Sequence, residues 1–570
     1  MEKTKIEMSE FDIKVWLSDP TTDGNHEHLG DNGTVFQKYV LIDGKLEGKY
    51  EDFHSNGVLM KRGIFSNGMK QGKWLVYHHN GQLWKECNYK DDKLNGKYNQ
   101  YLDNGVKVIV GNFKEGNFDG NWSYWHDNGN RDKIGKYILG RQEGKWIYYF
   151  EDTDSKWYEV EYKNNKMNGF STHFHKENGK VSHNGKYVDD LQTGLWEYYN
   201  YDKFKYRWGN FIEGKEDGEW VAYHHNQNIQ GKGVYKKGKK EGKWTYWWEN
   251  GNIELEGIYK NGKRNGLWTY WKENGVKVKS GNLKDDKKNG EWIVWYKDGK
   301  KSIKKTYVND KLNGEYIDWH PEGNEWKVGQ YKNGKLNDKY IEYHPNGNIY
   351  ISGFYLSGKK DGNWVFKYDN DEVLKTINYT KGIKNGNWVI FHKNKLKSFD
   401  YTYKNGEYNG KYTQWYQNGE IIESGKYKNG KKIGTWILRY ENGTKRKEIV
   451  YDKGEKVKEK KWDDKKHLVY EFNFKNNQKH GELIYWYKNG QIKLKETYID
   501  GRLDGEYIEY FIDGTFRGKG NMKSDSMNGK WTFYYHNGQK ELECEFGFGN
   551  LAGTAFIYHD NGMLKKEVSF

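Results

Sequence analysis

The sequence predicts an all-β fold, an elongated antiparallel array of β-hairpins that twists into a rod. The first observation is a glycine that recurs about every 24 residues, as at Gly48, Gly72, Gly96 and Gly120. About 23 copies of one short unit account for nearly the whole chain, which is typical of a repeat array. The second is the aromatic content. With 26 Trp, 49 Tyr and 24 Phe, a chain with 31% charged residues still has rings to bury.

The copy at residues 242–265 shows how each unit is expected to fold. Trp244 follows the glycine by two residues, and a second ring, Trp247, comes three residues later. Asn250-Gly251 then lies between two aromatic or β-branched runs, which predicts a hairpin with a type I′ turn. Because rings two and five residues after the glycine cannot share a face of a regular strand, we expect a β-bulge between them.

The second strand of the unit alternates from Ile253 to Gly257, and a polar turn returns the chain to the next glycine. Neighbouring hairpins then pair edge to edge, with about 10 Å of rise per unit and a length of about 200 Å for the array. Cys87 and Cys544 replace the glycine at the end of that strand. We interpret them as small residues in a close-packed position of an intracellular protein without a disulfide framework.

Four regions are predicted along the chain. Residues 1–23 form a lead-in or cap, 24–457 the regular array, 458–480 a degenerate unit, and 481–570 the C-terminal units with a closing strand. In the degenerate unit Lys458 replaces the glycine, Lys460 the tryptophan, and Lys466-His467 the turn. A hairpin that cannot fill its core opens at a lower free energy than its neighbours, so we predict a hinge there.

The patterns of common active sites and metal sites are absent from the sequence. It contains no phosphate-binding loop, no zinc-type spacing and no nucleophile elbow. We therefore predict a protein that is not an enzyme, with no catalytic residue, cofactor, metal or small-molecule substrate. Histidines such as His78 and His224 recur six residues after the glycine, and we interpret them as part of a solvated strand end.

One candidate binding site is a row of lysines at the same turn position in consecutive units. The row consists of Lys215, Lys239, Lys263, Lys287, Lys311, Lys335 and Lys359. In a regular array these charges are about 10 Å apart. In a basic chain with a formal net charge of +15, they would attract a polyanion such as acidic lipid, nucleic acid or an acidic protein. The alternative is that a tight turn simply requires a polar residue.

The run from Gly257 to Gly266, Gly-x-Tyr-x-Asn-Gly-Lys-x-x-Gly, resembles the MORN repeat. The run from Gly266 to Gly275, Gly-x-Trp-x-x-Trp-x-x-Asn-Gly, resembles the aromatic-rich bacterial variant of YwqK-family antitoxins. The resemblance covers residues 24–565. It implies a β-hairpin array without a cofactor that serves in scaffolding, self-association or tethering near a membrane.

We therefore predict a non-enzymatic scaffold or binding protein that presents a long surface to a protein partner or an anionic surface. Self-association stays open, and the alternatives are an antitoxin-like neutraliser of a partner protein and a glycan-binding repeat protein. The start of the chain lacks the apolar run of a signal peptide, and no stretch reaches the roughly 18 apolar residues of a membrane span. We expect an intracellular location, cytoplasmic or, for a viral source, in the virion or host cytoplasm.

Overall fold

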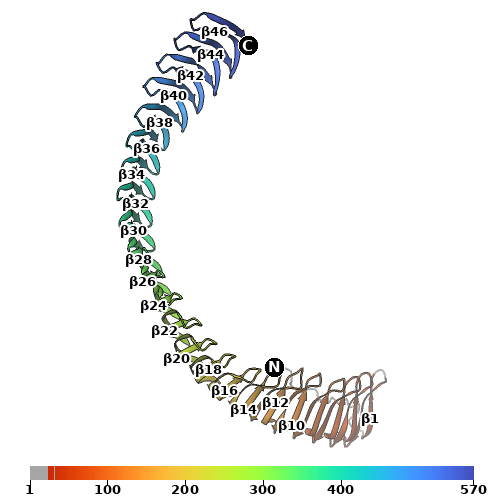
Figure 1. Ribbon diagram of the computed structural model, residues 1–570. Helices are drawn as coiled ribbons and strands as arrows, with labels where there is room; N and C mark the ends of the chain where they lie inside the picture. Colours follow the sequence, from red (N-terminus) through yellow and green to blue (C-terminus); the bar gives the residue numbers. More distant parts are fainter. Residues whose placement is uncertain (1–22, 31–32) are drawn as a thin grey trace. The chain divides into compact units, whose positions relative to one another are not determined.

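The computed structural model describes residues 23–30 and 33–570, so the predicted lead-in at 1–23 lies almost wholly outside the described residues. The described residues form 47 β-strands, all assigned to one antiparallel sheet, and no helix (Figure 1). The predicted all-β array of hairpins is thus confirmed. In the described part of the chain, no helix has the length and apolarity needed to cross a membrane.

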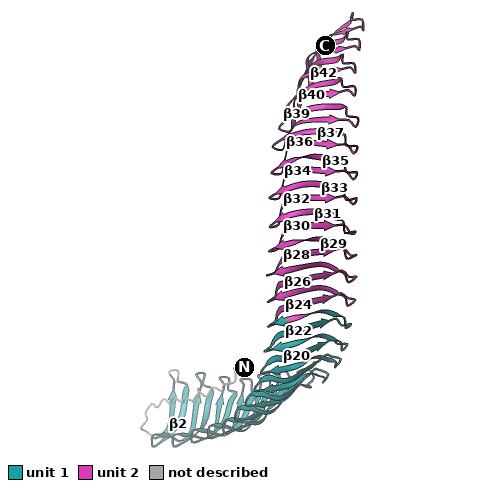
Figure 2. Ribbon diagram, turned by 90° about the vertical axis from the view of Figure 1, so that its left-hand side faces the viewer, with its two compact units in different colours: residues 1–278, 283–286 teal, residues 279–282, 287–570 magenta. Residues whose placement is uncertain are grey.

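The strands fall into two compact units (Figure 2). Unit 1 contains residues up to 278 together with 283–286, and unit 2 contains 279–282 and 287–570. β23 (Lys277–Lys284) contributes residues to both.

The other strands of unit 1 are β1 (Gly24–Leu29), β2 (Val35–Ile42), β3 (Lys45–Leu46), β4 (Gly48–Phe53), β5 (Leu59–Ser66), β6 (Met69–Tyr77), β7 (Leu83–Lys90), β8 (Lys93–Tyr101), β9 (Lys107–Lys114), β10 (Asn117–Trp125), β11 (Arg131–Ile138), β12 (Arg141–Tyr149), β13 (Lys156–Lys163), β14 (Lys166–Phe174), β15 (Val181–Val188), β16 (Leu191–Tyr199), β17 (Lys205–Ile212), β18 (Lys215–Tyr223), β19 (Ile229–Lys236), β20 (Lys239–Trp247), β21 (Ile253–Lys260) and β22 (Lys263–Trp271).

The other strands of unit 2 are β24 (Lys287–Trp295), β25 (Lys301–Val308), β26 (Lys311–Trp319), β27 (Glu325–Lys332), β28 (Lys335–Tyr343), β29 (Ile349–Leu356), β30 (Lys359–Lys367), β31 (Val373–Thr380), β32 (Ile383–Phe391), β33 (Lys397–Lys404), β34 (Glu407–Trp415), β35 (Ile421–Lys428), β36 (Lys431–Arg439), β37 (Lys445–Asp452), β38 (Glu455–Trp462), β39 (Leu468–Lys475), β40 (Gln478–Trp486), β41 (Ile492–Ile499), β42 (Arg502–Tyr510), β43 (Phe516–Lys523), β44 (Ser526–Tyr534), β45 (Lys540–Gly547), β46 (Asn550–Tyr558) and β47 (Leu564–Ser569).

The hairpin of β20 and β21 shows the pairing in detail. Its register shifts between Tyr246 and Trp247, so the irregularity predicted between the two rings is present. Trp244 is only 5% exposed, and its ring lies 5.8 Å from the ring of Tyr246 and 6.2 Å from that of Tyr259. The core is therefore built from the first ring, the ring two residues later, and the tyrosine of the second strand.

The first turn of the repeat differs from the type predicted for it. At the first turn Gly251 has a φ of 87°, whereas Asn250 is outside the left-handed region, and the amide of Gly251 donates to the Trp248 carbonyl at 2.9 Å. This is a type I turn followed by a left-handed glycine, so the predicted type I′ turn is wrong here. A type I′ turn instead joins successive repeats. Its two central residues, Asn261 and Gly262, have φ values of 51° and 81°.

Most of the repeat tryptophans pack on a glycine of the preceding hairpin, and Trp388, which faces Ile377, is an exception. A Cβ atom built on Gly257 would lie 2.2 Å from the ring of Trp268, and the indole N–H of Trp268 donates to the Ile258 carbonyl at 3.2 Å. Only glycine leaves room for the ring there. The same close contact with a glycine recurs at Trp74, Trp122, Trp146, Trp196, Trp220, Trp244, Trp292, Trp364, Trp436 and Trp531.

The two cysteines occupy the glycine position where the next hairpin has a smaller residue than tryptophan. Cys87 pairs with Tyr98, and Ala555 follows Cys544 in the corresponding position. Cys87 is fully buried and Cys544 is 5% exposed. Both are free thiols, which confirms their interpretation as small residues in a close-packed position.

The degenerate unit is better paired than its sequence suggests. β38 has eight residues where β36 has nine, and it pairs with β37 and β39 on its two sides. Because the strand is one residue shorter, Glu459 rather than Lys460 lies opposite Ile449, in the position that tryptophan has elsewhere. The predicted occupant of the aromatic position was wrong for this reason, and the hinge at 458–480 stays a prediction.

Buried ion pairs replace the tryptophan core in this hairpin. Glu459 is 4% exposed, and its carboxylate accepts hydrogen bonds from Lys447 at 2.7 Å, from Lys456 at 2.6 Å and from the Tyr470 hydroxyl at 2.7 Å. Burial opposes ionisation, but these hydrogen bonds outweigh it and lower the pKa of Glu459 to about 2.

Candidate interaction surface at the type I′ turns

Every lysine of the predicted row is the first residue of a strand and directly follows a turn that joins two repeats. Unit 1 carries Lys215, Lys239 and Lys263 at the starts of β18, β20 and β22. Unit 2 carries Lys287, Lys311, Lys335 and Lys359 at the starts of β24, β26, β28 and β30. All seven side chains are exposed. The structure therefore places the row on the edge formed by the turns.

At some of these turns the stem of one row lysine lies against the turn that carries the next row lysine. In unit 1, a Cβ atom on Gly238 would lie 3.8 Å from the Cβ of Lys215. In unit 2, a Cβ atom on Gly358 would lie 3.5 Å from the Cβ of Lys335. Since Lys239 and Lys359 follow those glycines directly, each lies next to the preceding lysine of the row.

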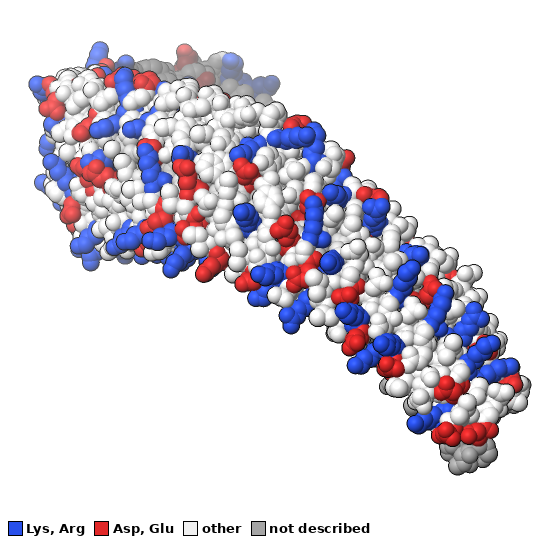
Figure 3. All heavy atoms as spheres, turned by 90° about the horizontal axis from the view of Figure 1, so that it is seen from below, with Lys and Arg blue, Asp and Glu red and all other residues white. Residues whose placement is uncertain are grey.

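The acidic side chains at this edge bond to the backbone of the turns. Glu241 accepts from the Asn261 amide at 2.7 Å, and Asp361 accepts from the Lys381 amide at 2.8 Å. Across the described part of the chain, the ion pairs include none of the seven lysines of the row. Elsewhere the surface is mixed, because basic and acidic side chains alternate on the face shown in Figure 3.

Where a second lysine follows the row lysine, as at Lys240 and Lys360, that second lysine has a different role, which the sequence analysis missed. The Lys240 ammonium lies 4.3 Å from the ring centroid of Trp244, and that of Lys360 lies 4.2 Å from the ring centroid of Trp364. Burial lowers the pKa of both ammonium groups. These lysines cover the core by cation–π contact, so in Lys239-Lys240 only the first side chain is free to meet a partner. Strand alternation relative to the tryptophan is the signal that would have shown this.

The recurring histidines join successive hairpins at the opposite edge. The Nε2 atom of His224 lies 2.7 Å from the Trp247 carbonyl, and that of His392 lies 3.1 Å from the Trp415 carbonyl. Tyr416 has the same role, because its hydroxyl donates to the Arg439 carbonyl at 3.2 Å. The interpretation as a solvated strand end is therefore wrong. The described residues contain no group of His, Cys, Asp and Glu side chains placed to hold a metal ion.

An asparagine ladder reinforces this edge. The Asn250 carboxamide donates to the Glu273 carbonyl of the next turn at 2.8 Å, while its oxygen accepts from the Asn252 amide of its own turn at 2.9 Å. Asn418 makes the same link to the Glu441 carbonyl at 3.0 Å. At Asn250 and Asn418 the asparagine thus links its own turn to the next one.

Seven segments match the model of the MORN repeat variant family. They are residues 70–91, 240–261, 288–309, 408–429, 479–500, 527–546 and 551–570. The segments lie in both units. These segments of the hairpin array therefore match MORN repeat variants, as the resemblance implied. No curated protein matches the chain.

Solved structures with a distant likeness are much longer proteins. Crystal structures described as TcdB2-TccC3-Cdc42 and TcdB2-TccC3 align over 97% of this chain, with 10% and 9% sequence identity and TM-scores of 0.11 and 0.12. A structure of the Photorhabdus luminescens Tc holotoxin pore aligns over 95%, with 11% identity and a TM-score of 0.12. The chain spans 31%, 32% and 30% of those chains. Likenesses with such TM-scores carry no argument about function.

Proposed function

We propose that the protein is a non-enzymatic binding array that holds an extended polyanion along its lysine-bearing turns. The observation that supports this is the row of seven exposed lysines at equivalent turns, outside every ion pair of the described residues. A row of equally placed cations suits a partner whose charges also repeat. Binding of this kind gains free energy from the release of counterions and needs no deep pocket.

The experiment measures retention of the full chain on anionic vesicles and on double-stranded DNA. The test variant reverses Lys263, Lys287, Lys311 and Lys335 to Glu. For DNA, losing four phosphate contacts lowers the slope of log K against log salt by about 3.6. We expect retention of the parent to fall steeply with salt and that of the variant to be lost.

The control variant reverses Lys272, Lys297, Lys393 and Lys488 to Glu. These side chains are exposed at the turns of the opposite edge. Because the control also reverses four lysines, it changes the net charge by the same amount. Retention of the control at the level of the parent supports a site at the row. Equal loss in both variants would show a non-specific effect of net charge, and equal binding by parent and test variant would refute the proposal.

The repeat tryptophans do not support the glycan-binding alternative. Trp146, Trp196 and Trp436 have no exposed surface, whereas a glycan platform needs accessible rings. The likeness to YwqK-family antitoxins remains a second expectation, with a protein as the partner. Competition between such a protein and DNA for the parent, lost in the row variant, would place that partner on the same turns.

A further inference from the structure

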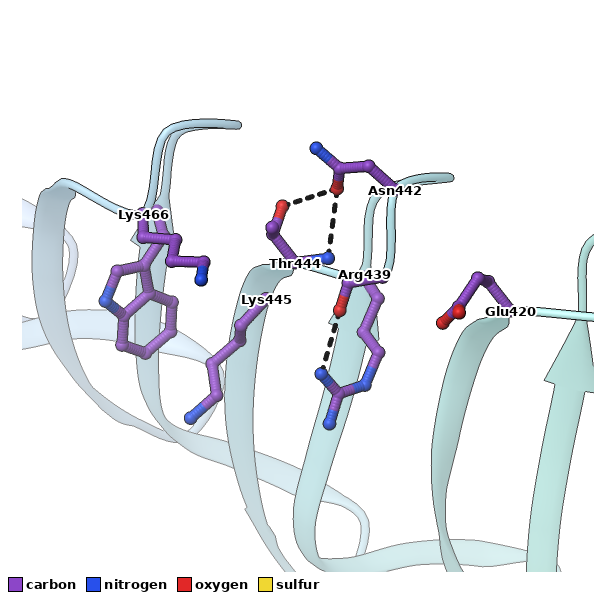
Figure 4. Close-up of a pocket in the computed structure, with 8 residues that line it drawn as sticks. Glu420, Arg439, Asn442, Thr444, Lys445 and Lys466 are labelled. Carbon is purple, nitrogen blue, oxygen red and sulfur yellow. Dashed lines mark hydrogen bonds between the residues drawn. The ribbon is translucent and has the colours of Figure 1, made fainter.

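A pocket opens at the opposite edge of unit 2, where the degenerate hairpin begins. It has a volume of about 580 Å³ and lies between the turn at 440–444 and the shifted turn at 463–467 (Figure 4). Successive turns at this edge are normally 24 residues apart. Here the step is 23 residues, because β38 is one residue shorter than β36, the first strand of the preceding hairpin. Hydrogen bonds still join the two turns, from the Tyr440 hydroxyl to the Trp462 carbonyl at 3.0 Å and from the Thr444 hydroxyl to the Asp464 carbonyl at 3.4 Å.

At this step the side-chain link to the next turn comes from Thr444, whose hydroxyl lies 3.4 Å from the Asp464 carbonyl. Asn442 still accepts from the Thr444 amide at 3.0 Å and from the Thr444 hydroxyl at 2.7 Å. The hydroxyl of Tyr440 still reaches the Trp462 carbonyl at 3.0 Å. However, the Asn442 carboxamide nitrogen makes no hydrogen bond within the described residues, in contrast to that of Asn418. Asn442 and Thr444 both line the pocket.

Three cationic side chains line the pocket, opposite one carboxylate. Arg439, Lys445 and Lys466 extend around it, and Glu420 lies on the far side (Figure 4). Arg439 donates to the Gly443 carbonyl at 3.1 Å and Lys445 pairs with Glu448 at 2.7 Å. Among the described residues, neither Arg439 nor Lys466 has an ion pair with a carboxylate.

The position of Lys466 is conformationally costly. Its φ is 72°, and it stands where most of these turns have glycine, such as Gly443 with a φ of 79°. A residue with a side chain adopts the left-handed region less favourably than glycine does. Lys395 adopts the same conformation at the same turn position, with a φ of 69°, but it is paired with Glu372 at 2.8 Å.

We propose that this pocket binds a phosphate dianion, either the free ion or the phosphate group of a monoester. The guanidinium of Arg439 can offer two parallel N–H donors to phosphate oxygens, and Lys466 supplies a second charge. The Asn442 carboxamide and the Thr444 hydroxyl line the same wall. The indole of Trp462 forms an apolar side of the pocket, with the Lys445 ammonium 4.7 Å from its ring centroid.

The proposal is tested by calorimetric titration of the full chain with inorganic phosphate and with phenyl phosphate, at constant ionic strength. We expect saturable binding that weakens at least tenfold in the variant R439Q with K466G. Tighter binding of phenyl phosphate would assign the pocket to a monoester, with the ring beside Trp462. Equal affinity would assign it to the free ion.

Three further variants separate ligand binding from structural effects. K466G introduces the residue suited to this turn, so it should preserve or raise thermal stability while weakening binding. E420Q removes the opposing carboxylate and should tighten binding at least threefold. K395Q, at the equivalent turn, should leave binding unchanged. Failure of both probes to bind the parent, or equal binding by parent and the R439Q, K466G variant, would overturn the proposal. The reversed lysine row should bind phosphate like the parent, so the two proposals fail independently.

Discussion

Replacing Trp268 by alanine tests whether stability in the array is local. The side chain is 1% exposed, and its ring lies 5.0 Å from that of Tyr259. Burying a tryptophan removes about 150–250 Å² from water, which at about 25 cal/mol per Å² gives roughly 4–6 kcal/mol. The alanine side chain retains only a small part of this burial free energy. Tryptophan-to-alanine changes in cores cost about 3–5 kcal/mol, so the two values agree.

The assay is native-state hydrogen exchange resolved by strand. The ring spans the glycine of β21 and hydrogen-bonds to the Ile258 carbonyl, so protection should fall in β20, β21 and β22. Because each repeat contacts only its neighbours, the cost should stay near the substitution. We expect strands many repeats away, such as β8 and β40, to keep the protection of the parent.

The matched control is Leu267→Ala in the same strand. Leu267 precedes Trp268 but is 56% exposed, so its loss should change stability by less than about 0.5 kcal/mol. A fall in protection spread evenly over all strands of the W268A variant would refute the nearest-neighbour account. An effect of L267A as large as that of W268A would show that the ring is not the source of the stability.

Three other outcomes are expected. Gly257→Ala places a Cβ 2.2 Å from the Trp268 ring and should cost about 1–3 kcal/mol in thermal unfolding; an unchanged midpoint would contradict the packing. Since the pKa of Glu459 is about 2 when folded and 4.5 in its ordinary state, the unfolded chain binds its proton first, and the stabilisation is lost as pH falls from about 4.5 to 2. Exchange in β37 to β39 should rise over that window in the parent but not in E459Q, and a similar rise in both would exclude Glu459 as the cause. Limited trypsin digestion should cut first at the exposed turn lysines Lys465 and Lys466 if the predicted hinge exists, and early cuts scattered over other turns would exclude it.

Much of the fold could be predicted because its determinants are local. The glycine, the tryptophan two residues later and the Asn-Gly turn recur within one unit, and each favours a strand or a turn by itself. The glycine position could even be interpreted where cysteine replaces it, at Cys87, because the period fixes its place. Pairing between neighbouring hairpins could also be predicted, since a single hairpin cannot bury its rings alone.

The turn types could not be predicted because both turns contain the same residue pair, Asn-Gly. Asn250-Gly251 and Asn261-Gly262 look equivalent in the sequence, and the difference lies in the ladder around them. The register shift at Trp247 leaves an odd residue in the first hairpin, which suits a type I turn with a left-handed glycine. The paired Lys260 and Lys263 frame the second, which suits type I′.

Some features of the candidate sites could likewise be predicted from the sequence, and others could not. The lysine row is a property of the period, so its placement on one edge followed from the sequence. The inward side chain of Lys240 required the strand parity, and the histidine contacts required the distance between adjacent turns. Neither is visible in a single unit, because each depends on what the next hairpin presents.

The degenerate hairpin shows how one missing residue changes both the core and the surface. Shortening β38 brings Glu459 to the tryptophan position, where Lys447, Lys456 and Tyr470 must satisfy its charge. The same shortening places the turn that carries Lys466 one residue nearer in the sequence to the preceding turn. A buried carboxylate without its partners would destabilise the hairpin strongly, so the lysines around Glu459 help to keep this hairpin paired. The ion network and the cationic pocket therefore lie at the same shortened hairpin, and neither follows from the residue types alone.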